Sequence, residues 1–343
     1  MQTLKKITLI AEGFPKGGAA LSVLDRVAGG YPRDGAYRER LAPEVLVHNL
    51  GGSQEELSRR TADLGIVGVG ELAASVSGSD GVILIPGDGK VGLAPATTEM
   101  VLRSMRPGTV CFGVGLIAER AADAEHLLGL AGEGGIRFTW GSLVMSTFRL
   151  PENGLESKGR ARDALIVVQG DDASALAAGV FGLASELQPA PESDGAVACY
   201  RNDAVWKANA VGEWSWGLLG AALSRSSNAQ GSAVTDGRTQ DLVGLGMVQR
   251  LAERPRAWIT RHEGGGRSAI LALDGVVKDV NVATRDRHGD VRSARLYRPP
   301  APNEAGYHRL VAQIEDALVG LTPEWKRERT IGMAAWWERL KRA

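Results

Sequence analysis

Acidic and basic side chains on a glycine-rich turn are the first candidates for chemistry in this sequence. Pro86-Gly87-Asp88-Gly89-Lys90 follows an apolar run and places an acid two residues before a base. Asp88 and Lys90 could therefore position a polar substrate or exchange a proton with it as catalytic groups. A flexible glycine loop with a solvated ion pair explains the same residues without catalysis.

A second group of candidates lies between residues 149 and 216. Trp206, Lys207, Trp214 and Trp216 place three indoles near one lysine in the sequence. A lysine desolvated among indoles has a lowered pKa and could act as a catalytic base, while Trp206 or Trp214 could stack on a sugar-like ring. Arg149 could bind a carboxylate or phosphate of a substrate. The alternative is that the tryptophans pack in the core or between domains, with Lys207 in solvent.

Apolar runs alternate with helix-like stretches over the first 140 residues, and these elements must position Asp88 and Lys90. Strands are predicted at Ile7–Ile10, Glu44–His48, Gly65–Val69, Gly81–Ile85, Thr109–Val114 and Ile136–Trp140. Helices are predicted at Ala19–Val27, Gly52–Leu64 with Ser53 as N-cap, Pro95–Met105 and Ala118–Leu130. Continuous apolar strands separated by helices favour a doubly wound parallel sheet. Ligands of such sheets collect at the carboxyl ends of the strands, where residues 86–90 and His48 lie.

The pattern changes after Gly141 to that of an antiparallel sheet interrupted by helices. Strands are predicted at Ala164–Val168, Gly195–Tyr200, Ala257–Arg261, Ser268–Leu273, Val276–Ala283 and Val291–Tyr297, and helices at Asp172–Leu187, Trp214–Ser224, Thr239–Leu251, Asn303–Val319 and Pro323–Lys341. Hairpins are expected around residues 264–266 and at Asp274-Gly275. Leu310, Ile314 and Leu318 predict a buried stripe on one helix. The expected domains are 1–140, 141–302 and 303–343, the last made of helices that pack back on the body.

Composition excludes several classes of protein. Lys and Arg together number 40, as do Asp and Glu, so no net charge attracts the chain to nucleic acid or to anionic lipid. Cys111 and Cys199 cannot form a disulfide framework, and no Cys/His cluster has the spacing of a structural zinc site. No apolar run reaches the roughly 20 residues of a membrane span. We expect a soluble cytoplasmic protein that binds a small polar metabolite, without nucleic acid, membrane or metal.

Several segments together resemble one enzyme family. They are Gly141-Ser142-Leu143, Phe148-Arg149-Leu150-Pro151, Asp203–Ala208, Gly212–Ser215, Leu271–Gly275 and Leu296–Pro300. These segments, in this order, resemble the glucose–fructose oxidoreductase, inositol dehydrogenase and rhizopine-catabolism (Gfo/Idh/MocA) family, of which the chain looks like a divergent member. The resemblance implies an N-terminal Rossmann-like doubly wound parallel sheet, followed by an α+β domain with a large, mostly antiparallel sheet. It also implies NAD or NADP as cofactor, a polyol, sugar or hydroxy-acid-like substrate, and a homo-oligomer formed through the second sheet.

The resemblance also suggests where a dinucleotide would bind. It assigns cofactor contacts to Glu12, Gly13, Lys16, Gly17, His48, Pro86 and Gly87. In the family a glycine-rich turn after the first strand lets backbone N–H groups approach the pyrophosphate. Here the turn lacks G-x-G-x-x-G, Pro15 removes one donor, and Glu12 places a carboxylate where a phosphate would lie, although Lys16 could offset it. The alternative is a plain strand-to-helix loop and no bound cofactor.

Two catalytic groups of the family are missing. Its Glu-Lys-Pro lysine corresponds to the segment Cys111–Leu116, whose one ionisable group is a thiol that we expect to be buried and inert. Its acid/base histidine corresponds to Gly179.

Three hypotheses follow. The first is a divergent NAD(P)-dependent oxidoreductase in which Lys207, Asp88 or Lys90 moves the proton; the second is a non-redox lyase or isomerase, and the third a catalytically silent partner subunit.

Overall fold

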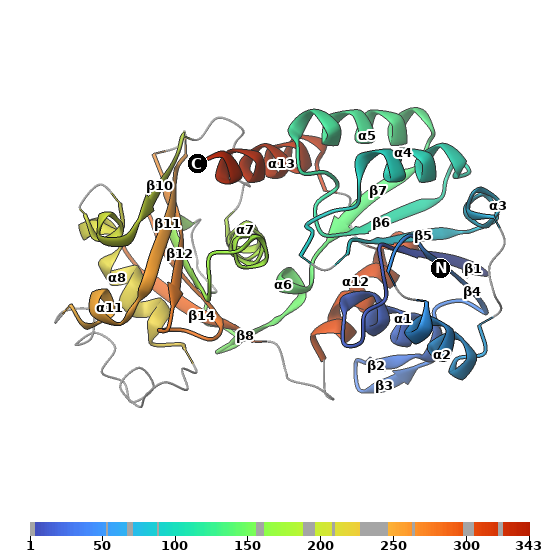
Figure 1. Ribbon diagram of the computed structural model, residues 1–343, viewed down its shortest axis with the longest axis horizontal. Coiled ribbons are helices and arrows are strands. Elements are labelled where there is room, and N and C mark those ends of the chain that lie inside the picture. The colour runs from blue at the N-terminus through green and yellow to red at the C-terminus, as the bar shows by residue number, and fades with distance from the viewer. Residues whose placement is uncertain are drawn as a thin grey trace. The chain divides into compact units, whose positions relative to one another are not determined.

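The computed structural model divides the chain into two compact units (Figure 1). It describes residues 4–52, 54–66, 71–87, 89–155, 161–187, 196–207, 210–226, 246–262, 265–297, 305–321 and 325–343. Unit 1 comprises Met1–Ser146 and Pro299–Ala334, and unit 2 comprises Thr147–Arg298 and Ala335–Ala343. Among the described residues no helix is both long and apolar enough to cross a membrane. The domain boundaries expected at residues 140 and 302 stay a prediction.

Unit 1 is built on a five-stranded parallel sheet in the order β4-β1-β5-β6-β7. Its strands are β1 (Lys6–Ala11), β4 (Glu44–Asn49), β5 (Gly81–Ile85), β6 (Val110–Val114) and β7 (Arg137–Gly141). The chain runs outward from β1 to β4 and then returns to the other side of β1 for β5, β6 and β7. The strand order therefore reverses between β1 and β5, and this topological switch point is where open α/β sheets bind ligands. The predicted doubly wound parallel sheet is confirmed.

Helices cover both faces of this sheet, as their apolar faces require (Figure 1). The helices of unit 1 are α1 (Ala19–Gly29), α2 (Glu55–Asp63), α3 (Leu72–Ser77), α4 (Pro95–Ser104), α5 (Ala121–Glu133), α6 (Leu143–Ser146) and α12 (Ala305–Leu318). The predicted stripe of Leu310, Ile314 and Leu318 on α12 is buried in one core cluster with apolar residues of α1, β1 and β5. The expected helix around residue 55 begins at Glu55 after Gln54, and the predicted cap Ser53 lies outside the described residues. Most of the strand predicted at 65–69 also lies outside them.

A hairpin of β2 (Tyr31–Arg33) and β3 (Ala36–Arg38) was not expected from the sequence. Its turn places Asp34 and Gly35 at φ angles of 51° and 78°, as an Asp-Gly hairpin turn requires. The hydroxyl of Tyr31 donates to Glu315 Oε2 at 2.5 Å, and Arg33 Nη1 donates to the same oxygen at 2.7 Å. These contacts join the hairpin to α12, which is distant in the sequence.

Unit 2 contains a seven-stranded sheet in the order β10-β11-β12-β9-β13-β14-β8. The strands are β8 (Phe148–Leu150), β9 (Ala161–Val168), β10 (Ala196–Arg201), β11 (Glu253–Arg261), β12 (Arg267–Asp274), β13 (Val280–Asp286) and β14 (Val291–Tyr297). Within this sheet, as far as the structure describes it, only the β9–β12 pair is parallel, so the mostly antiparallel sheet is confirmed. The hairpin expected near residue 265 joins β11 to β12, whereas that expected at Asp274-Gly275 is wrong. The register instead places β9 between β12 and β13, because a long-range strand pairing overrides the local turn.

Helices α7 (Ala173–Glu186) and α8 (Gly212–Leu223) pack on opposite faces of this sheet. The short helix α11 (Met247–Leu251) matches the end of the helix predicted at 239–251. Residues 239–245 of that prediction lie outside the described residues. In α13 (Arg327–Arg342), Trp336 and Trp337 are buried, and Trp336 Nε1 donates to Thr260 Oγ1 at 2.8 Å. Packing therefore accounts for this tryptophan pair.

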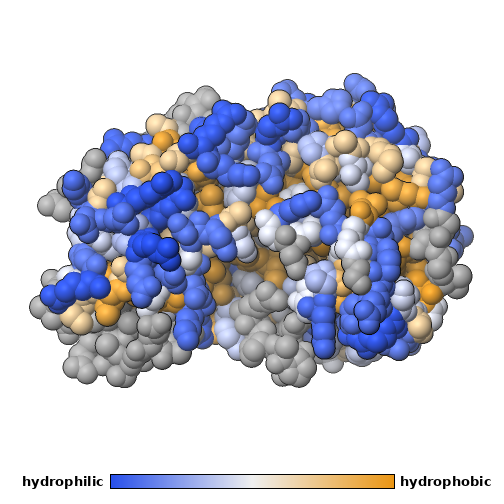
Figure 2. Space-filling model, in the orientation of Figure 1, coloured by the Kyte–Doolittle hydropathy of each residue, from blue (hydrophilic) through white to orange (hydrophobic). Residues whose placement is uncertain are grey.

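Large apolar side chains that remain exposed are scattered over the molecule. Among the described residues they are Tyr37, Leu50, Met100, Leu150, Leu251, Val291 and Leu321, each on a different element or loop. Figure 2 shows hydrophilic residues distributed over the visible face with apolar ones between them. These residues do not mark one docking surface, and the homo-oligomer stays a prediction.

Candidate functional site

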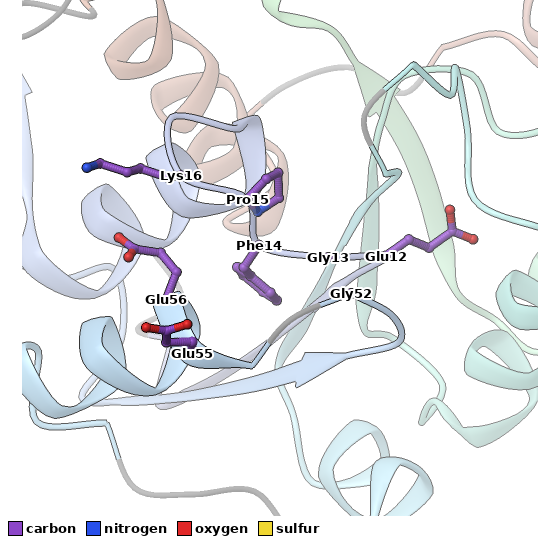
Figure 3. Close-up of a pocket in the computed structure, with 8 residues that line it drawn as sticks. All are labelled: Glu12, Gly13, Phe14, Pro15, Lys16, Gly52, Glu55 and Glu56. Atoms are coloured by element: carbon purple, nitrogen blue, oxygen red, sulfur yellow. The ribbon is translucent and has the colours of Figure 1, made fainter.

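A pocket of about 480 Å³ lies in unit 1 where β1 and β4 end (Figure 3). It is lined by Glu12, Gly13, Phe14, Pro15, Lys16, Gly52, Glu55 and Glu56. The first five residues form the loop between β1 and α1, and the others lie between β4 and the first turn of α2. The pocket is therefore formed by two loops at the carboxyl edge of the sheet, as in ligand sites of α/β folds. Of these residues, the sequence analysis names Glu12, Gly13 and Lys16 as candidate cofactor contacts, and it misses Gly52, Glu55 and Glu56.

Buried side-chain and backbone contacts hold the β1–α1 loop in place. Phe14 is only 2% exposed and packs in the core of unit 1, and the Gly18 N–H donates to the Pro15 carbonyl at 2.9 Å. The first helical bond of α1 runs from the Ser22 N–H to the Gly18 carbonyl, and no side chain caps the helix. The amides that precede Ser22 in the helix lack helical partners. This end of α1 is therefore suited to an anionic group such as a phosphate.

Carboxylates dominate the side of the pocket formed by α2. Glu55 and Glu56 lie close together there, and the side chain of Lys16 extends from the β1–α1 loop above Glu56 in the view (Figure 3). Arg59 pairs with Glu56, and their hydrogen bond holds the pKa of Glu56 below its ordinary value. Carboxylate oxygens accept hydrogen bonds from hydroxyl groups and repel phosphates. The sequence does contain a signal for Glu55 and Glu56, because they form a pair of acids soon after a buried strand. Acids in the first turn of a helix are, however, usually explained by their favourable interaction with the helix dipole.

Glu12 forms an ion pair at the switch point between β1 and β5. Its carboxylate points away from Glu55 and Glu56 (Figure 3), and its Oε2 accepts hydrogen bonds from Lys90 Nζ at 2.8 Å and from the Gly87 amide at 3.4 Å. Burial alone would raise the pKa of Glu12, but the bonds from Lys90 and Gly87 outweigh it and lower the pKa. The expectation that Lys16 offsets Glu12 is wrong because Lys90, 78 residues away in the sequence, takes that place.

Backbone contact closes the carboxyl end of β6. The Leu116 N–H donates to the Val91 carbonyl at 2.6 Å. A Cβ on Gly115 would lie 2.2 Å from the Val91 oxygen, and one on Gly92 would lie 2.3 Å from the Leu116 oxygen. Cys111 on β6 is fully buried, which raises the pKa of its thiol far above the ordinary value. In the segment corresponding to the family's lysine, Gly115 therefore has no space for a side chain, and the one ionisable group is a buried thiol.

Other predicted cofactor contacts lie around this pocket without lining it among the described residues. His48 near the end of β4 has a buried Nε2 with no hydrogen-bond partner in the described part of the chain. Burial lowers the pKa of His48, which favours the neutral imidazole. Gly17 has a φ angle of 74° in the turn before α1, and Pro86 follows β5 directly. Asp88 lies outside the described residues.

The candidate catalytic and substrate-binding residues of unit 2 either contact other residues of the protein or are exposed to solvent. Lys207 is exposed at the end of a 3-10 helix (Asn202–Trp206), so the expected desolvation among indoles is not found. Trp206 stacks on Trp216 with ring centroids 6.2 Å apart. Trp214 Nε1 donates to the Ala210 carbonyl at 2.7 Å, and the Arg267 guanidinium covers the Trp214 ring at 4.5 Å. Their catalytic and substrate-binding roles stay predictions.

Arg149 on β8 already has an anionic partner. It donates to Glu186 Oε1 and to Ser185 Oγ, both at 2.9 Å, and to the Thr147 carbonyl at 2.6 Å. A substrate carboxylate or phosphate would have to compete with Glu186 for this guanidinium. The proposed clamp by Arg149 therefore stays a prediction.

The position corresponding to the family's histidine also lacks space. Gly179 lies in α7, and a Cβ there would approach Ile270 Cγ2 to 2.6 Å. Ile270 is a buried residue of β12. A histidine at this position would therefore require the helix and the sheet to move apart.

Solved structures of dehydrogenases share this fold over nearly the whole chain. UDP-N-acetylglucosamine 3-dehydrogenase GnnA from Acidithiobacillus ferrooxidans is 14% identical, with 99% of this chain and 97% of that chain covered at a TM-score of 0.52. A scyllo-inositol dehydrogenase from Lactobacillus casei with NAD(H) and scyllo-inositol is 10% identical, covering 100% and 97% at a TM-score of 0.58. GenD2 from gentamicin A biosynthesis, in complex with NAD, is 9% identical, covering 100% and 95% at 0.61.

These similarities concern the fold, and they confirm the fold that the resemblance to the inositol dehydrogenase family implied. No protein-family model matches the sequence. No curated protein matches it either.

Proposed function

We propose that this protein is an NAD-dependent oxidoreductase acting on a small polyol, sugar or hydroxy-acid-like metabolite. The observation that carries the proposal is the pocket at the ends of β1 and β4, in a fold shared with NAD-binding dehydrogenases. Its volume of about 480 Å³ suits part of a dinucleotide. Our predictions of a cytoplasmic protein and of a homo-oligomer formed through the second sheet belong to the same proposal.

The residues around the pocket fit the cofactor. The free amides at the start of α1 and the backbone of Gly13 would hold phosphate oxygens, with Lys16 nearby. Glu55 and Glu56 would accept hydrogen bonds from ribose hydroxyls and repel a 2′-phosphate, which favours NAD over NADP. When bound, NAD accepts or returns the hydride, and a side chain of this protein must take or give the hydroxyl proton. Asp88, Lys90 and Lys207 are the candidates for that proton transfer.

Binding of NADH and NADPH to the purified protein tests the proposal. A ligand that binds only the native state stabilises it by about 2.7 kcal/mol at a hundred times its Kd, so NADH should raise the thermal midpoint and NADPH should raise it less. Oxidation of a panel of polyols and sugars with NAD then tests the activity. No shift at millimolar concentrations of either dinucleotide would contradict the proposal.

The closed end of β6 and the crowded position of Gly179 favour two alternative functions. Without the lysine and the histidine, the same fold could serve a non-redox lyase or isomerase, or a silent partner subunit. NADH binding without turnover of any polyol or sugar, together with a stoichiometric partner on purification, would favour the silent subunit. Turnover of a substrate that is independent of dinucleotide would favour the lyase or isomerase.

A further inference from the structure

The Glu12–Lys90 ion pair lies at the switch point between β1 and β5 and has two unequal partners. Glu12 is the first residue after β1, and its side chain is 14% exposed, whereas that of Lys90 is 58% exposed. The Glu12 N–H donates to the Ile85 carbonyl at 3.2 Å, which fixes the backbone of Glu12 to the end of β5. Lys90 belongs to a glycine-containing turn, and its Nζ reaches Glu12 from the solvent side. Of the two groups, the lysine is therefore the one that can readily turn to another anion.

Glu12 keeps its negative charge because its surroundings favour the ionised form. Lys90 and the amide of Gly87 both donate to its Oε2, and the pKa of Glu12 lies below its ordinary value. Glu12 also lines the pocket described above. A diphosphate bound by the loop between β1 and α1 would lie near this carboxylate, whose ion-pair partner among the described residues is Lys90.

We propose that Glu12 and Lys90 form an exchangeable ion pair, in which a diphosphate group of the bound nucleotide replaces the Glu12 carboxylate on the Lys90 ammonium. The proposal rests on the proposed function, since it needs a dinucleotide at this edge. Glu12 then weakens nucleotide binding and Lys90 strengthens it, without covalent chemistry. Lys90 becomes a phosphate ligand, which leaves Asp88 and Lys207 as candidates for proton transfer.

The test is the affinity of full-length variants for NADH and for adenosine, which lacks phosphate. The variants are Glu12→Gln, Lys90→Gln and, for comparison, Lys16→Gln, which removes one positive charge from the pocket without touching the pair. Glu12→Gln should bind NADH about tenfold tighter and Lys90→Gln about tenfold weaker, the size of one charge-assisted hydrogen bond. The loss in Lys90→Gln should exceed that in Lys16→Gln. Adenosine should bind all four proteins alike, and circular dichroism checks that each is folded.

The outcomes separate this inference from the proposed function. If the wild type binds NADH and Glu12→Gln binds it no tighter, the exchange is overturned while the proposed function stands. If Glu12→Gln tightens adenosine as much as NADH, the carboxylate acts on the shape of the pocket and the exchange is again overturned. If neither the wild type nor Glu12→Gln binds NADH at millimolar concentration, the proposed function fails.

Discussion

The carboxyl edge of the parallel sheet is open on the β4 side of β1 and closed by contacts on the β5 side. On the β4 side two loops leave a pocket of about 480 Å³ between them. On the β5 side the Glu12–Lys90 ion pair bridges the ends of the strands, and beyond it the backbones of Val91 and Leu116 are in direct contact. Under the proposed function, the open side suits the nucleotide end of the cofactor. The closed side includes the segment Cys111–Leu116, which corresponds to the lysine segment of the family that the sequence resembles.

Glycines contribute to both sides for different physical reasons. Gly13, with a φ angle of 118°, lets the β1–α1 loop turn without a side chain that would enter the pocket. Gly92 and Gly115 instead let two backbones approach each other so closely that no Cβ fits. A glycine-rich turn in a sequence therefore does not distinguish room for a ligand from room for another strand or loop.

The largest expected effect is on the closed side, from Gly115→Ala. The new Cβ would lie 2.2 Å from the Val91 oxygen, and the residue has a φ angle of 103°, so the substitution is strained in two ways. We expect a loss of about 2–4 kcal/mol in the free energy of unfolding, measured by urea denaturation. The control is Gly132→Ala in α5, where a Cβ meets nothing within 4 Å and should be neutral or stabilising by up to about 1 kcal/mol. Equal effects at the two positions would show that the β6 end is not closed by this contact.

The open side should respond in cofactor preference and not in stability. Replacing Glu55 and Glu56 by Gln removes two negative charges from the pocket and leaves Arg59 with Asp63 as its ion-pair partner. We expect the ratio of the Kd values for NADPH and NADH to fall about tenfold, which is about 1.4 kcal/mol. The control Glu133→Gln, on the exposed surface of α5, should leave the ratio unchanged. An unchanged ratio in the double variant would remove these carboxylates from the ribose site.

The sequence predicts the open side better than the closed side because the two sides depend on contacts of different sequence separation. Apolar runs separated by helices are local patterns, and they indicated the parallel sheet and the loops at its carboxyl edge. The Glu12–Lys90 pair joins residues 78 positions apart, and no periodicity reveals which lysine meets which acid. In unit 2 the Asp274-Gly275 turn suggested a hairpin, but β9 pairs with both flanking strands. Long-range pairing thus decided what local turn chemistry could not.

The smallest expected effect is that of the ion pair on stability, because Lys90 is largely exposed. At pH 7 we expect Lys90→Gln to lower the free energy of unfolding by no more than about 1 kcal/mol. The pKa of Glu12 is lowered on folding from an ordinary 4.5, so its contribution is complete above that value and is lost as the pH falls through the lower, folded pKa. The difference between wild type and Lys90→Gln should therefore shrink as urea denaturation is repeated at pH values below 4.5. A difference that stays constant or grows in acid would mean that Lys90 stabilises the protein through its aliphatic chain and not through Glu12, so that the closed side would not depend on this charge pair.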